Sequence, residues 1–304
     1  VYPRWIPLPP GNLPPRGQRR DEYAFTLAEH LICGEEKFDK DNYWQWLAYN
    51  TMAALLYFVT VKVEQAKAND YFLGKLLDKG RLNKDDRDIL LSYYVMMPQR
   101  YAGEAMAKLK EGSLEAEDYF PIGSWEGIPA AWQGKEACMA MFTDWMLHNY
   151  FKSQDQLRQE GISTPGERNN DWRQWLESLL LECGLFNYDR MIVDGLQQFL
   201  YLSRQQRQIV FPLLLKPLKV FTNLIIRERS SSNDFCLSQL RGIRNEKGEW
   251  QPVTVYCIAN TRSSKLLNRM FLEVLLRYNV KFGAKGPLPL LAVLDDVGQT
   301  LRVN

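Results

Sequence analysis

The sequence is poor in the side chains that build metal centres and disulfide frameworks. Its 304 residues include only two histidines, His30 and His148, so a histidine-based metal site or catalytic triad is hard to assemble. The cysteines are odd in number, widely spaced and without a C-x-x-C pair: Cys33, Cys138, Cys183, Cys236 and Cys257. This pattern is typical of buried, reduced thiols in a cytosolic protein.

The chain also lacks an excess of charge of either sign. Thirty-eight Lys and Arg residues face 36 Asp and Glu residues, which leaves a formal charge of +2. That balance excludes a surface that attracts nucleic acid or membranes as a whole, so any site for a polyanion must be local. With 46% hydrophobic and 24% charged residues, the composition excludes disorder and predicts a folded protein with a substantial core.

Long hydrophobic runs are missing as well. The best candidate for a membrane span, residues 47–61, falls short of the roughly 20 apolar residues required and is interrupted by Asn50, Thr51 and Thr60. We therefore predict a helix buried in protein. The chain starts at Val1 without a basic and then apolar leader, so we expect no signal peptide.

What is present is mostly helical in pattern. Residues 1–20 hold six prolines and four arginines, which predicts an extended lead-in segment. After Asp21, apolar residues recur at helical spacing, and no alternating strand pattern stands out before residue 226. The predicted helices cover residues 23–32, 42–68, 82–97, 99–110, 134–157, 172–183, 189–202 and 209–226. The middle of the chain is thus predicted to be an all-helical body.

The pattern changes near residue 250. A β-branched run at 252–259, an amphipathic helix at 263–279 and a continuously apolar run at 287–294 predict a strand, a crossover helix and a buried parallel strand. Two parallel strands cannot bury their faces alone, so the other strands must come from elsewhere. The fold class expected is mainly α, with part of an α/β sheet at the end.

The apolar run ends in two carboxylates, Asp295 and Asp296. The carboxyl end of a parallel strand is where open α/β sheets bind ligands. In P-loop nucleoside triphosphatases the first such acid holds Mg²⁺ and the next orients the attacking water. The phosphate-binding pattern G-x-x-x-x-G-K-[ST] is absent, however, since Gly74-Lys75 and Gly134-Lys135 lack its other residues. Solvated acids at the end of a strand are the alternative.

A basic segment at 203–247 is the candidate for nucleic-acid binding. Nine basic residues face three acidic ones there: Arg204, Arg207, Lys216, Lys219, Arg227, Arg229, Arg241, Arg244 and Lys247. Such a segment forms either a solvated helix face or a surface that follows phosphates. In contrast, residues 104–126 and 155–194 are acidic, and they are either simply solvated or a docking surface for basic tails.

Several segments together resemble one family, the TraG/TraD-type coupling ATPases of type IV secretion and conjugation. In chain order they are Trp5-Ile6-Pro7-Leu8, Asp41-Asn42-Tyr43-Trp44, Ser232-Asn233-Asp234-Phe235 with Leu240-Arg241, Val253-Thr254-Val255-Tyr256, and residues 291–296 as a Walker B motif. The resemblance implies an all-α domain at 21–248 inserted into a RecA-like P-loop core. Residues 1–20 and 249–304 would be parts of that core.

The resemblance also implies function. Asp295 matches the Walker B aspartate, a ligand of Mg²⁺, and Asp296 stands where the family usually has glutamate. The parent protein would bind ATP and Mg²⁺, whereas this chain alone is expected to bind neither and to hydrolyse no ATP. Its helical domain would select effector proteins or relaxase–DNA complexes at the cytoplasmic face of the bacterial inner membrane. The parent would be a hexamer that works with other secretion components, and the isolated chain a monomer. The alternative is a DNA-binding module that uses residues 203–247.

Overall fold

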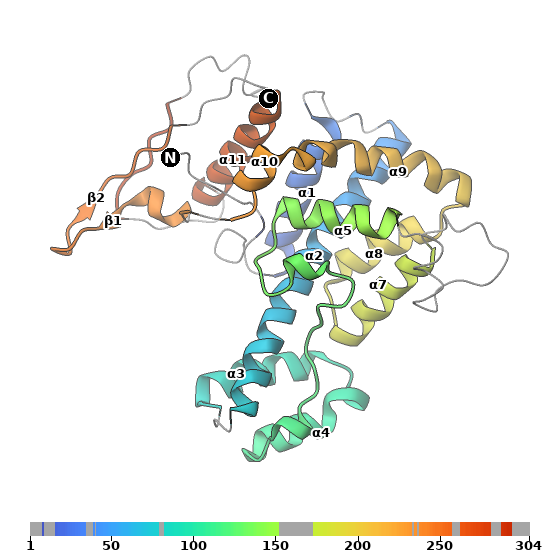
Figure 1. The fold of residues 1–304 in the computed structure, drawn as a ribbon, viewed down its shortest axis with the longest axis vertical. Coiled ribbons are helices and arrows are strands. Elements are labelled where there is room, and N and C mark those ends of the chain that lie inside the picture. The colour runs from blue at the N-terminus through green and yellow to red at the C-terminus, as the bar shows by residue number, and fades with distance from the viewer. Residues whose placement is uncertain are drawn as a thin grey trace.

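The computed structural model describes residues 8, 16–34, 39, 41–78, 82–151, 173–232, 234–235, 237–256, 262–280 and 287–293. Within these residues the molecule is mainly helical, as predicted (Figure 1). The helices are α1 (Gln18–Cys33), α2 (Tyr43–Leu77), α3 (Lys84–Met96), α4 (Gln99–Glu111), α5 (Met139–Phe151), α7 (Arg173–Phe186), α8 (Arg190–Leu200), α9 (Arg204–Leu218), α10 (Leu224–Arg229) and α11 (Arg262–Val280). Four short 3₁₀ turns lie between them: η1 (Ala116–Asp118), η2 (Ala130–Trp132), η3 (Lys219–Thr222) and η4 (Leu237–Arg241).

Helix starts follow capping side chains in the sequence. The Asn42 side chain accepts a hydrogen bond from the backbone of Gln45 at the start of α2, and Asn83 caps α3 in the same way. The Ser203 side chain accepts from the Gln206 backbone and the Gln206 side chain accepts from the Ser203 backbone, and this capping box starts α9 at Arg204, five residues before the predicted start.

The predicted helix at 209–226 is divided in the structure. Helix α9 ends at Leu218, η3 follows, and α10 begins at Leu224 with Asn223 as its cap. Pro217 stands in the last turn of α9, and proline removes a helical backbone donor and crowds the preceding turn. The lead-in is likewise shorter than predicted, because α1 already begins at Gln18.

Helix α2 is the central element of the fold. It contacts α1, α8 and α9, and its middle residues from Leu47 to Val63 are almost all buried. By length and composition it could cross a membrane, but 83% of its apolar window is buried inside the protein. This agrees with the prediction of a buried helix. Where α8 crosses α2, Gly195 brings the two backbones close together.

The predicted strands near the end of the chain are not found in the described residues. Residues 252–256 and 287–293 form no strand, and Leu291 and Val293 are 84% and 82% exposed rather than buried. The only strands described are β1 (Ile243–Arg244) and β2 (Trp250–Gln251), which pair antiparallel. A segment forms a ladder only beside a neighbouring strand, and the described residues offer it none. The helix predicted between these segments is confirmed as α11.

Figure 1 shows how these parts are arranged. Helices α3 and α4 form a lobe around one end of α2, whereas α11 and the β1–β2 hairpin lie on a different side of the helical body. Helix α11 contacts α1, and the Arg269 side chain donates to the carbonyl of Gly34 just after α1. The first and last described helices are therefore neighbours.

Three of the five cysteines lie in described residues, and all three are buried free thiols, as predicted: Cys33, Cys138 and Cys183. Burial raises the pKa of Cys138 to about 11. A thiol that stays protonated at neutral pH is a poor nucleophile. We therefore assign these cysteines to the core rather than to chemistry.

Candidate functional site

Three of the predicted phosphate-binding arginines are used inside the protein. Arg207 is 8% exposed and donates to the carbonyls of Leu200 and Leu202, at 2.8 and 2.5 Å, where α8 ends and its carbonyls lack helical partners. The Arg241 Nε atom donates to the Leu288 carbonyl at 2.6 Å. These guanidinium groups hold chain segments together.

Arg227 is the third. Its guanidinium donates to both carboxylate oxygens of Asp144 on α5 and lies 5.3 Å from the centre of the Trp132 ring. The Trp132 indole also donates to Asp144, at 2.6 Å. Burial alone would raise the pKa of Asp144, but these hydrogen bonds outweigh it and lower that pKa. The cluster fastens α10 to α5.

This cluster gives a prediction for acid stability. Because the pKa of Asp144 is lower in the folded chain, its ion pair stabilises the fold above about pH 4, the unfolded value, and is lost as pH falls through the folded value. Asp144→Asn should cost about 1 kcal/mol at neutral pH. Urea titrations should show the wild type approaching the variant as pH drops below about 4. A difference that stays constant with pH would contradict this assignment.

The predicted basic residues that the structure describes as exposed do not form one surface. Lys216 and Lys219 are exposed on α9 and η3, while Arg244 and Lys247 are exposed on the hairpin. Figure 1 shows α9 and the hairpin on different sides of the molecule. Arg229 is half-buried, and the side chain of Arg204 lies outside the description. The two predicted Walker B residues, Asp295 and Asp296, also lie outside the described residues.

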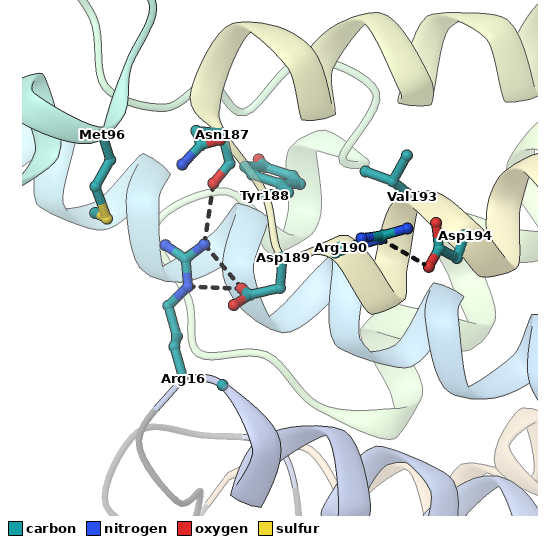
Figure 2. A pocket seen from close by; sticks show the side chains of 9 residues that line it. Arg16, Met96, Asn187, Tyr188, Asp189, Arg190, Val193 and Asp194 are labelled. Carbon is teal, nitrogen blue, oxygen red and sulfur yellow. Dashed lines mark hydrogen bonds and ion pairs between the residues drawn. The ribbon is translucent and has the colours of Figure 1, made fainter.

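An open pocket of about 650 Å³ lies where three distant parts of the chain meet (Figure 2). Arg16 and Gly17 contribute from the segment before α1, Met96 from the end of α3, and residues 187–194 from the turn into α8. Two ion pairs line it. Arg16 contacts the Asp189 carboxylate at 2.8 Å, and Arg190 lies 3.4 Å from Asp194.

Local backbone geometry places the residues of this turn. Asn187 has a φ of 50°, a left-handed conformation that asparagine tolerates better than most residues. Asp189 occupies the N-cap position of α8, but its side chain makes no capping bond and binds Arg16 instead. Arg16 also donates to the Asn187 carbonyl. Burial disfavours the guanidinium charge, yet Asp189 outweighs this and raises the pKa of Arg16.

A buried polar network supports the pocket from behind. The Tyr188 hydroxyl donates to Glu182 at 2.8 Å, and the Lys62 ammonium group binds both oxygens of the same carboxylate at 2.6 and 2.7 Å. Lys62 is only 1% exposed. Burial, with Glu182 second, raises the pKa of Tyr188 well above its ordinary value. The turn from Asn187 to Asp189 is therefore fixed on both sides, by Lys62 and Glu182 inside and by Arg16 outside.

Chemically, this pocket is suited to recognition. Among its residues the charged groups are already paired, and no group of acids, histidines and cysteines in the described residues could hold a metal ion. Sequence reasoning missed the pocket because Arg16 and Asp189 are 173 residues apart. The only local indication was the connection at 184–188, between the predicted helices at 172–183 and 189–202.

Comparison with known proteins gave no relative: no family model, curated protein or solved structure matches this chain. The resemblance to coupling ATPases therefore stays a prediction from the sequence.

Proposed function

We propose that this chain is the substrate-receptor module of a type IV secretion coupling ATPase. One observation supports the proposal beyond the sequence pattern: α11, from the segment expected to belong to the P-loop core, packs against α1, the first helix of the helical domain, and Arg269 donates to the Gly34 carbonyl. Such a contact is expected where an inserted domain meets the core that carries it. The helical lobe of α3 and α4 and the open pocket then offer surfaces for cargo.

In this proposal the parent protein supplies the nucleotide chemistry. Bound ATP and Mg²⁺ would be held by its P-loop domain, with Asp295 as the Mg²⁺ ligand and Asp296 near the attacking water. This chain has no phosphate-binding loop, so we derive no catalytic step from it. The parent would act as a hexamer at the cytoplasmic face of the inner membrane, with effector proteins or a relaxase as cargo.

Deletion of the module within the parent gene tests the proposal. Residues 35–248, the part of the helical domain after α1, can be replaced by a flexible Gly-Ser linker that leaves the segment expected to belong to the core intact. We expect loss of conjugative transfer, or of delivery of a reporter effector, while the purified parent still hydrolyses ATP with Mg²⁺. Unchanged transfer would contradict a receptor role. Absence of Mg²⁺-dependent ATP hydrolysis by the intact parent would contradict the ATPase.

The DNA-binding alternative has a test of its own. Three of the nine basic residues first proposed to bind phosphates hold the protein together, and the four described as exposed lie on different sides of the molecule. We therefore expect weak binding of single- and double-stranded DNA, with at most a shallow fall of log affinity against log salt concentration. Fluorescence anisotropy at several salt concentrations measures it. A steep slope that decreases in a Lys216→Ala, Lys219→Ala variant would favour DNA as the partner.

A further inference from the structure

The charges of the pocket in Figure 2 cancel one another. Arg16 is paired with Asp189 and Arg190 with Asp194. The carboxylates of Asp189 and Asp194 lie beside the guanidinium groups that a phosphate or a nucleotide would approach. They would repel such a ligand, because each added anion would meet a fixed negative charge. A ligand that suits the pocket therefore has little net charge of its own and offers both hydrogen-bond donors and acceptors.

Its uncharged lining fits a polypeptide. Met96, 44% exposed, and Val193 provide apolar contacts at opposite ends of the pocket, from two different helices (Figure 2), and a methionine adapts its shape to what it contacts. The exposed Asn187 side chain carries an amide, which has a donor and an acceptor in the same arrangement as a peptide group. These groups together match one apolar side chain and the main chain that carries it.

We propose that this pocket binds an extended peptide segment of the recruited protein, with one large apolar side chain against Val193. The Asn187 amide pairs with the peptide main chain on the side of the pocket toward Met96. This inference rests on the proposed function only in naming the recruited protein as the source of the peptide. The binding chemistry itself follows from the pocket.

The Arg190–Asp194 pair sets the charges next to the anchor. Its atoms are 3.4 Å apart, and the side chains are 92% and 61% exposed, so the pair contributes little stability. Each group can exchange its partner for one from a ligand at small cost. An acidic residue of the peptide then pairs with Arg190 and a basic residue with Asp194, on the two sides of the apolar anchor.

The floor of the pocket, in contrast, is already fixed. Arg16 holds Asp189 through its Nε and Nη2 atoms, and Tyr188 is tied to Glu182 in the core. A site that is ordered before binding loses less conformational entropy when the ligand arrives. Recognition by this pocket therefore needs no refolding of the turn at 187–189.

Panning a phage library of random linear peptides on the full chain tests the proposal. We expect enriched sequences with one large apolar residue flanked by charges of opposite sign. Synthetic copies of them should lose about tenfold or more in affinity for Val193→Arg, which fills the pocket. Asn187→Gly, which removes the amide but keeps the left-handed backbone accessible, should weaken binding as well. Leu181→Arg is the matched control, since Leu181 is 76% exposed on α7 outside the pocket.

A charge exchange gives the sharpest readout. In the double variant Arg190→Glu, Asp194→Arg the ion pair is kept but reversed, so panning should select peptides with the two flanking charges exchanged. Failure to enrich any sequence, equal binding to Val193→Arg and wild type, or an unchanged charge order would overturn the proposal. If peptides bind as expected but transfer survives deletion of residues 35–248, the receptor function fails and the peptide site stands.

Discussion

Replacing Glu182 with leucine should lower the free energy of unfolding by about 3–5 kcal/mol. The carboxylate is the partner of the Lys62 ammonium group, which is 1% exposed, and it also accepts the Tyr188 hydroxyl. Removing one member of a buried pair leaves the other charged, desolvated and without compensation. Urea unfolding followed by circular dichroism measures the effect as a lower midpoint at an unchanged slope.

The double variant Lys62→Met, Glu182→Leu is the control. With both charges gone, apolar side chains of similar volume fill the same space, and such replacements are often neutral. We expect most of the lost stability to return. If Glu182→Leu alone costs less than about 1 kcal/mol, Lys62 reaches water and the network behind the pocket is not buried as described.

Gly195→Ala should also destabilise the fold, by about 1–3 kcal/mol, although alanine is the better helix former. A Cβ atom at residue 195 would lie 2.5 Å from the Ala54 Cβ atom and 3.3 Å from the Asn50 carbonyl oxygen. Because both neighbours belong to the central helix α2, neither can move far. Thermal or urea unfolding measures the loss.

A compensating change identifies the cause. Ala54→Gly removes the methyl group that the new one would meet, so the double variant Gly195→Ala, Ala54→Gly should approach wild-type stability. Gly184→Ala is the matched control in the neighbouring helix α7, because nothing lies within 4 Å of a Cβ atom there. Equal effects of the two alanine substitutions would contradict a close crossing of α2 and α8.

Helices were predictable because their signals are local. Apolar residues at helical spacing located α2, α3, α4, α7 and α8. The same periodicity could not divide the segment at 209–226, since Pro217 and the Asn223 cap act against a continuous apolar pattern. The ends of α9 and α10 therefore depend on Pro217 and Asn223 rather than on the spacing of apolar residues.

Tertiary features were beyond the sequence. The apolar run at 287–294 predicted a buried strand, but a strand needs a neighbour, and Leu291 is exposed in the structure. A count of basic residues could not show that Arg207 and Arg227 are turned to partners inside the protein. The ion pair of Arg16 and Asp189 joins residues that no local pattern relates. Charge and hydrophobicity along the chain thus predicted elements well and surfaces poorly.

The length of α2 has a mechanical consequence. Thirty-five residues at 1.5 Å each make a rod of about 52 Å that runs from the helical body into the lobe of α3 and α4 (Figure 1). Arg20 on α1 pairs with Glu64 of α2, and from there about 20 Å of helix lead to Leu77. A tilt of about 5° at this pair would move Leu77 by about 2 Å, so a small rotation of α2 near α1 would shift the lobe of α3 and α4.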